Sequence, residues 1–101
     1  MVDKPKRPVQ LSLFDSVILE SKQLKALESP RGAFYNIWLI REPGQGFYIV
    51  KKESGTIHKR LDTRSWKFDN FILAKHFYQK KIIEKTNPKR KTRIYLIANS
   101  M

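Results

Sequence analysis

The sequence predicts an α+β fold, a small antiparallel β-sheet meander with one amphipathic helix packed on it. Strand-like runs separated by turn residues occupy residues 33–68, and a helix-like pattern follows and ends before Pro88. The chain has 101 residues, of which 41% are hydrophobic and 12% aromatic, enough for one modest core. We therefore expect a single domain over residues 16–101.

The N-terminal part of the chain is the least regular. Residues 1–9 are polar, basic and proline-bearing, so we expect a disordered basic tail. Two interpretations of residues 11–27 stay open. One is a strand at about residues 16–20, which we favour, and the other is an amphipathic helix that carries Phe14, Val17, Ile18, Leu24 and Leu27.

The central region predicts three antiparallel strands. Residues 33–41 alternate, with Tyr35, Ile37 and Leu39 on one face and Asn36, Trp38 and Ile40 on the other. Residues 42–46 should form a hairpin loop into a strand at residues 47–52. Glu53-Ser54-Gly55 should form a tight turn into a third strand from Thr56 to about Phe68.

A helix should begin after an N-cap at Asp69 or Asn70 and end at Asn87-Pro88, because proline cannot continue it. One broad arc of this helix is apolar and should pack on the sheet: Phe71, Leu73, Ala74, Phe77, Tyr78 and Ile82. The opposite side should show Lys75, His76, Gln79 and Lys80 to water, with Ile72 and Ile83 outside the apolar arc. A basic loop and a last strand at residues 93–97 complete the predicted sheet.

The net charge of +12 lies mostly in the second half of the chain. Residues 1–50 hold seven basic and five acidic side chains, whereas residues 51–101 hold fourteen and four. A surface this cationic predicts a polyanionic partner, and nucleic acid is the commonest soluble one.

Several classes of protein are excluded or disfavoured by what the sequence lacks. It has no cysteine and no apolar run long enough for a membrane span, and its N-terminus does not resemble a secretory signal. The two histidines, His58 and His76, lack partners at metal-ligand spacing. A glycine-rich phosphate loop, a nucleophile elbow and a catalytic carboxylate pair are missing too. We expect a cytoplasmic, non-enzymatic protein without metal, cofactor or small-molecule substrate.

Residues 33–97 contain a series of motifs with a characteristic order and spacing: Phe34-Tyr35-Asn36-Ile37-Trp38-Leu39-Ile40, Phe47-Tyr48-Ile49-Val50, Phe68-Asp69-Asn70-Phe71-Ile72-Leu73-Ala74, Tyr78, Ile82 and Glu84-Lys85-Thr86. In this order and spacing the chain resembles a WGR domain, a small antiparallel sheet with one packed helix that occurs in DNA-dependent poly(ADP-ribose) polymerases and in short bacterial proteins. This chain has Glu53-Ser54-Gly55-Thr56-Ile57 where the family places Trp-Gly-Arg. The resemblance thus implies the fold and a general nucleic-acid role, but not recognition of DNA ends.

A short motif in residues 10–15 suggests a second partner. Gln10-Leu11-Ser12-Leu13-Phe14 matches the pentapeptide by which bacterial polymerases and repair proteins bind the sliding clamp. In such peptides the apolar side chains fill adjoining pockets and the glutamine amide fixes the register. The alternative is that Leu11, Leu13 and Phe14 are the first core residues of the domain.

Nucleic-acid contacts should come from basic side chains and from one tryptophan that can stack on a base or sugar. The candidates are Lys51, Lys52, Lys59, Arg60, Arg64, Trp66, Lys67, Lys89, Arg90, Lys91 and Arg93, to which the helix adds Lys75, Lys80 and Lys81. The alternative for Trp66, which we favour, is a core position beneath the helix. Trp38 is the other stacking candidate unless the N-terminal segment covers its face of the sheet.

We thus expect a DNA-binding accessory domain of bacterial type, tethered to the replication clamp and acting in DNA replication and repair. One rival is a small, basic, ribosome-dependent ribonuclease toxin in which Arg90, Arg93, Tyr95 and His76 act as catalysts. Its helices would normally precede most of its sheet, whereas strands come first here. A second rival is a protein-binding adaptor whose charge serves solubility.

Overall fold

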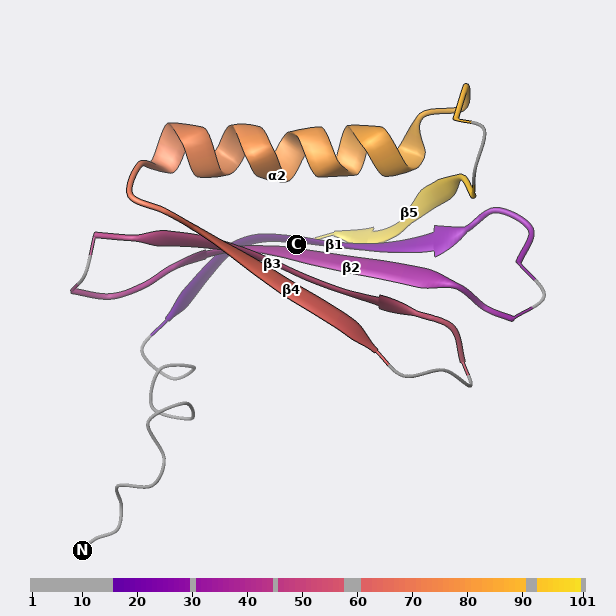
Figure 1. Cartoon of the computed structure of the whole chain (residues 1–101), viewed down its shortest axis with the longest axis horizontal. Coiled ribbons are helices and arrows are strands. Elements are labelled where there is room, and N and C mark those ends of the chain that lie inside the picture. Colours follow the sequence, from indigo (N-terminus) through magenta and orange to yellow (C-terminus); the bar gives the residue numbers. More distant parts are fainter. Residues whose placement is uncertain (1–15, 30, 45, 58–60, 91–92, 101) are drawn as a thin grey trace, which may run out of the picture.

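The computed structural model describes residues 16–29, 31–44, 46–57, 61–90 and 93–100. Their fold is one five-stranded antiparallel sheet with a helix packed across one face (Figure 1), which confirms the predicted α+β class. The elements in chain order are β1 (Val17–Ala26), β2 (Phe34–Arg41), β3 (Tyr48–Gly55), β4 (Asp62–Phe68), α2 (Phe71–Thr86) and β5 (Tyr95–Ser100).

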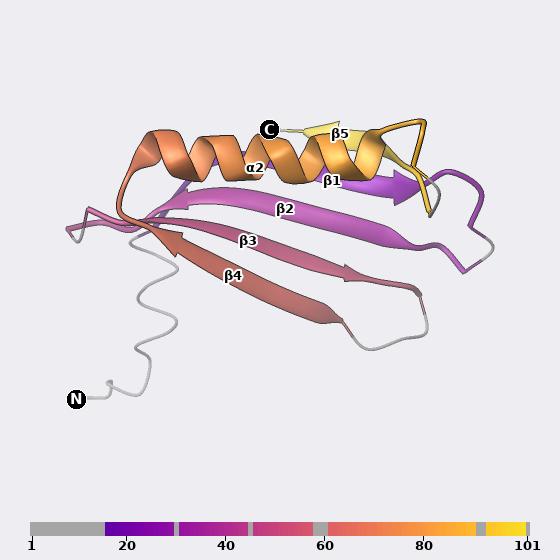
Figure 2. The ribbon, with the colours of Figure 1, turned by 45° about the horizontal axis from the view of Figure 1, so that its top comes forward.

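The sheet is a meander with one returning strand. Strands β1 to β4 pair in sequence, and β5 comes back along the free side of β1, giving the order β4-β3-β2-β1-β5. Figure 2 shows β3 and β4 extending out from beneath the helix on one side. The helix therefore leaves part of its own side of the sheet open.

The bounds of four strands differ from the sequence-based expectation. The first strand runs from Val17 to Ala26 and not over residues 16–20, because β2 and β5 pair with it on both sides. The predicted turn at residues 53–55 is wrong, since these residues continue β3 and pair with residues 34–36 of β2. Strand β4 starts at Asp62 rather than at residue 56, and β5 occupies Tyr95–Ser100 rather than residues 93–97.

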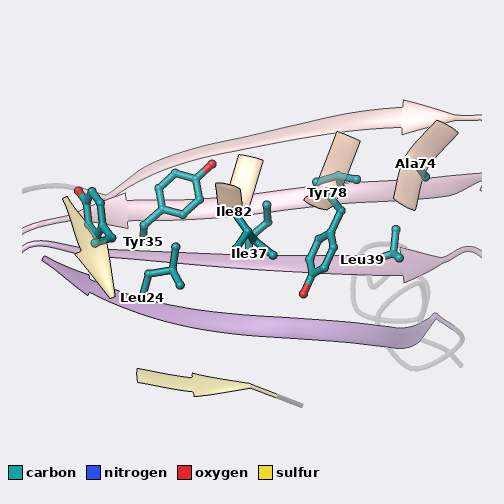
Figure 3. Packing of buried hydrophobic residues seen from close by; sticks show 9 residues of the cluster. Leu24, Tyr35, Ile37, Leu39, Ala74, Tyr78 and Ile82 are labelled. Atoms are coloured by element: carbon teal, nitrogen blue, oxygen red, sulfur yellow. The ribbon is translucent and has the colours of Figure 1, made fainter. Parts of the chain in front are cut away.

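The core lies between the sheet and the helix. The alternating residues Tyr35, Ile37 and Leu39 of the central strand β2 are buried, as predicted, and they point at the helix (Figure 3). The remaining buried residues of this cluster are Leu24, Val50, Ala74, Tyr78, Ile82 and Tyr95. Trp38 and its alternate neighbours on β2 consequently face the other side of the sheet.

The two ends of α2 follow the local signals in the sequence. Asn70 is the N-cap, and its Oδ1 accepts a hydrogen bond from the backbone N–H of Leu73 at 3.2 Å. The helix ends at Thr86, and Asn87 before Pro88 has extended backbone geometry. Both predicted boundaries of the helix are confirmed.

The buried stripe of α2 is narrower than the predicted arc. Ala74, Tyr78 and Ile82, spaced by four residues, are buried, whereas Leu73 is 56% and Phe71 42% exposed. A sheet is broad but touches only one line of a helix, so residues at the rim of the arc stay in water.

Lys75 was expected to face water on α2, but it contacts the sheet instead. Its ammonium forms an ion pair with Glu20 of β1, and both side chains are about two-thirds buried. The contact lies at the rim of the buried stripe and joins the helix to the sheet.

Candidate nucleic-acid interface

The structure divides the predicted basic residues between the two faces of the sheet. Lys52 and Arg64 are cross-strand partners on the side that carries α2, whereas Lys51 and Lys67 alternate to the opposite side. Lys89 and Arg93 are exposed on either side of the connection between α2 and β5. Eight predicted residues lie outside the described part of the chain: Gln10, Leu11, Ser12, Leu13, Phe14, Lys59, Arg60 and Lys91.

On the helix side, five cationic residues form what we term the helix-side cluster: Lys52, Arg64, Lys81, Lys85 and Arg90. Lys52 is at its centre and is only 7% exposed. Its Nζ lies 2.6 Å from Oδ2 of Asp62 and donates to Oγ of Ser54 at 2.9 Å. A buried ammonium needs such partners, so Lys52 is fixed in position by the sheet.

The ring of Tyr35 links the strands to the end of the helix. Nζ of Lys52 lies 5.7 Å and Nζ of Lys85 lies 4.9 Å from the centre of this ring. Burial, followed by the negative charge of Glu84, raises the pKa of Tyr35 to about 12. The hydroxyl therefore stays neutral at physiological pH, and Tyr35 serves as a cation–π surface between two ammonium groups.

Trp66 forms the neighbouring part of this surface. Its ring lies 4.8 Å from that of Phe77 on α2, and Nζ of Lys81 lies 5.4 Å from its centre. Trp66 is thus partly buried beneath the helix, as the core interpretation of this residue predicts. Its aromatic face is occupied by Phe77 and Lys81, so it supports the cluster rather than offering a free stacking surface.

Burial and the neighbouring positive charges of the cluster both act on the ammonium of Lys85. Burial lowers the pKa of Lys85, and Arg90, Lys81 and Lys52 lower it further. The acids that offset this charge are Asp62 on Lys52 and Glu84, 3.8 Å from Lys81. The site therefore holds more positive than negative charge and favours an anion.

Lys85 is the member of the cluster that the sequence did not single out. Phe77, Lys81 and Lys85 recur every four residues and follow one flank of α2, beside the buried stripe. This periodicity was the available signal, but a basic flank of a helix is ordinarily just solvated surface. Only the packing of Lys85 against Tyr35 of β2 assigns it to the cluster.

The opposite side of the sheet, which we term the open face, holds the other predicted cations. Nζ of Lys51 lies 5.6 Å from the ring of Trp38, its cross-strand neighbour. Nζ of Lys67 lies 4.7 Å from the ring of Phe47 and 3.6 Å from a carboxylate oxygen of Glu42. Trp38 therefore lies beside a cation on a face that no described element covers (Figure 1).

The residues cast as catalysts of a ribonuclease occupy different environments. His76 is exposed on α2, whereas Tyr95 is buried with its ring 6.1 Å from that of Tyr35.

In the described ranges, no three acidic or histidine side chains come together in a way that would hold a metal ion. Among the same residues, no helix combines the length and apolar character that crossing a membrane requires.

No protein-family model matches this chain, and no curated protein is similar to it in sequence. The WGR resemblance therefore stays a prediction.

Proposed function

We propose that this chain is a non-enzymatic accessory domain that binds nucleic acid, with DNA favoured, through phosphate contacts at the helix-side cluster. The observation that carries the proposal is the crowding of Lys52, Lys81, Lys85 and Arg90 around the buried ring of Tyr35 and the partly buried ring of Trp66. Arg64 extends the cluster onto the exposed edge strand β4.

Phosphate oxygens fit this cluster better than a base edge does. Lys81, Lys85 and Arg64 offer charge and hydrogen-bond donors, while Trp66 is already packed against Phe77. Such contacts give affinity and orientation without reading sequence. We therefore propose binding with little sequence preference, which suits an accessory role.

The resemblance to WGR domains supports the same role. The observed sheet with one packed helix has the architecture that the resemblance implies. In this chain Glu53, Ser54 and Gly55, where the family places its Trp-Gly-Arg motif, are part of β3. We propose a nucleic-acid role of the WGR kind that does not depend on contacts from those three positions.

The motif Gln10-Leu11-Ser12-Leu13-Phe14 supports a second element of the proposal, tethering to the replication sliding clamp. A clamp pull-down should recover the wild-type chain and lose the variant that combines Leu13→Ala with Phe14→Ala. Equal recovery of both would remove the clamp from the proposal and leave nucleic-acid binding untouched.

The nucleic-acid proposal is tested by titrating a short DNA duplex at several salt concentrations. The variant Lys81→Gln plus Lys85→Gln should bind more weakly, and its plot of log affinity against log salt should be less steep by about 1 for each phosphate that is no longer neutralised. The matched control is Arg41→Gln plus Lys80→Gln, two exposed residues outside the cluster.

The control separates the effect of the position of the charges from the effect of net charge, because both double variants remove two positive charges. If both weaken binding equally, the cluster has no special part in it. If neither RNA nor DNA binds while the clamp does, the adaptor interpretation applies. Growth arrest with cleaved messenger RNA on expression would instead support the toxin.

A further inference from the structure

The open face carries a hollow of about 590 Å³ at the end of the β1–β2 hairpin. Its polar and aromatic lining comes mainly from two neighbouring strands: Gln23 and Lys25 of β1, and Phe34 and Asn36 of β2. Ser29, Gly32 and Ile57 close its end. A volume of this size is typical of sites for small organic groups.

Strand register places the lining residues in matched pairs. Gln23 lies opposite Asn36, and Lys25 lies opposite Phe34. Gln23 and Asn36 are therefore cross-strand neighbours on this face, as are Lys25 and Phe34. Oε1 of Gln23 also accepts a hydrogen bond from Nδ2 of Asn99 of β5 at 3.5 Å. Each carboxamide carries both a donor and an acceptor, the combination that recognises the edge of a nucleobase.

The wall formed by Ile57 is held by a close backbone approach. Gly32 has a φ of +65°, and a Cβ atom at this position would lie 2.6 Å from Cδ1 of Ile57. This left-handed conformation favours glycine, and a larger residue would also have to displace the exposed side chain of Ile57. The end of the hollow is therefore built into the turn between β1 and β2.

Trp38 continues the same surface along β2. Side chains on one face of a strand alternate, so Phe34, Asn36 and Trp38 follow one another on the open face. Four residues of strand separate the two aromatic positions by roughly 13 Å. Lys51 lies over the ring of Trp38.

The charges of the open face favour an anionic ligand. Lys25 is exposed beside the hollow, and Lys51 and Lys67 lie further across the sheet. Two acids share the face: the carboxylate of Glu53 lies 3.9 Å from Nζ of Lys51, and that of Glu42 lies 3.6 Å from Nζ of Lys67. The three lysines thus outnumber these two acids, and a polyanion with flat apolar rings is complementary to the surface.

We propose that the open face binds unpaired nucleotides of a single-stranded nucleic acid, with one base in the hollow and another stacked on Trp38. Gln23 and Asn36 meet the edge of the first base, Phe34 supports its ring, and Lys25 and Lys51 contact phosphates. A duplex does not fit this role, since its bases are stacked and paired. The site is separate from the helix-side cluster, which lies on the other side of the sheet.

The two tryptophans of the chain allow each face to be observed by itself. In the variant Trp66→Phe, all tryptophan emission comes from Trp38. Titration with oligo(dT) and with oligo(U) should quench it saturably, because both present unpaired bases to the ring. In the variant Trp38→Phe, oligo(dT) should leave the emission of Trp66 nearly unchanged.

Binding variants then locate the ligand on the open face. The substitution Trp38→Ala should weaken binding of oligo(dT) by roughly 5- to 150-fold, the range for loss of one stacked base. Gln23→Ala plus Asn36→Ala should also weaken it, whereas the control Thr63→Ala plus Ser65→Ala, on the same face but outside the hollow, should not. Apart from Trp38→Ala, these substitutions change exposed or half-buried polar side chains, and folding is checked by the thermal midpoint of each variant.

Three results would overturn the proposal. The first is unchanged Trp38 emission with both oligonucleotides, and the second is loss of the quenching in Lys81→Gln plus Lys85→Gln, which would place the strand on the helix side. The third is a response of Trp38 to an apolar peptide but not to oligonucleotides, which would assign the face to a protein. Duplex binding by the wild type is measured separately, so this proposal and the helix-side one fail independently.

Discussion

The ammonium of Lys52 is buried in the sheet and bound to the carboxylate of Asp62, with Nζ 2.6 Å from Oδ2. The two residues come from neighbouring strands, β3 and β4, and Lys52 belongs to the helix-side cluster. The hydrogen bond and the charge of Lys52 lower the pKa of Asp62 below its ordinary value of 3.8. Protonation of Asp62 would therefore remove the charged partner that holds Lys52 in its place in the cluster.

We predict that Asp62→Asn lowers the thermal midpoint at neutral pH, because it leaves the buried Lys52 without its counter-ion. A carboxyl whose pKa is lowered on folding contributes stability above its unfolded pKa and loses it as the pH falls through its folded pKa. The wild type should therefore lose stability below about pH 3.8, and the variant should lose less. Thermal scans across this range, with Asp69→Asn as control, measure the difference, and identical curves for the two variants would contradict the prediction.

The N-cap of α2 predicts a second stability effect. Asn70→Ala removes the side-chain acceptor for the N–H of Leu73 and should cost about 1 kcal/mol in the free energy of unfolding. Asn70→Asp keeps an acceptor oxygen and should restore most of it. Urea denaturation of the three proteins checks this, and a neutral Asn70→Ala would mean that the cap contributes nothing.

Tyr78 provides a third prediction, which separates its ring from its hydroxyl. The residue is 1% exposed, its hydroxyl oxygen has no hydrogen-bond partner among the described residues, and burial raises its pKa to about 12. Tyr78→Phe should leave the free energy of unfolding unchanged or raise it by up to about 1 kcal/mol. Tyr78→Ala should lower it by about 3–5 kcal/mol, as for other buried aromatic side chains. A loss above about 1 kcal/mol for Tyr78→Phe would show that the hydroxyl makes a stabilising contact.

Lys85 should affect binding and stability in opposite directions. A lysine whose pKa is lowered on folding disfavours the folded state while it is charged, and this cost is relieved as the pH rises through its folded pKa. Lys85→Met keeps the apolar stem and removes the charge. We predict equal or slightly higher stability at neutral pH, by less than about 1 kcal/mol because solvent screens much of the repulsion, together with weaker duplex binding. A clear loss of stability with unchanged binding would contradict the role assigned to Lys85.

Local signals in the sequence were enough to predict the ends of the helix and the buried and open faces of β2. Asn70 caps the start of α2 and Asn87-Pro88 ends it, and both effects depend only on neighbouring residues. Tyr35, Ile37 and Leu39 alternate with more polar residues because one face of β2 is buried. The length of β1 was underestimated because Lys22, Gln23 and Lys25 interrupt the alternation of apolar and polar residues. The length also depends on pairing with β2 and β5, which the sequence of β1 itself does not show. Secondary structure of this kind is determined by tertiary contacts rather than by propensity.

The candidate site was predictable only in part, for the same reason. Charge counting identified Lys52, Arg64 and Arg90 as cations, but not that they share one side of the sheet, while Lys51 and Lys67 lie on the other. That division follows from the parity of residues in β3 and β4, whose registers depend on where each strand begins. Because the third strand was expected to start at residue 56 rather than at Asp62, this register could not be predicted.

The most direct test of the helix-side cluster is an NMR titration of the isotopically labelled chain with a short DNA duplex at low salt. We predict that the largest shifts fall on the side chains of Arg64, Lys81 and Lys85 and on the indole N–H of Trp66. Amides around Ile72 and His76, on the exposed side of α2, should move little. Shifts concentrated on the exposed side of α2, or spread evenly over all lysines, would contradict this assignment.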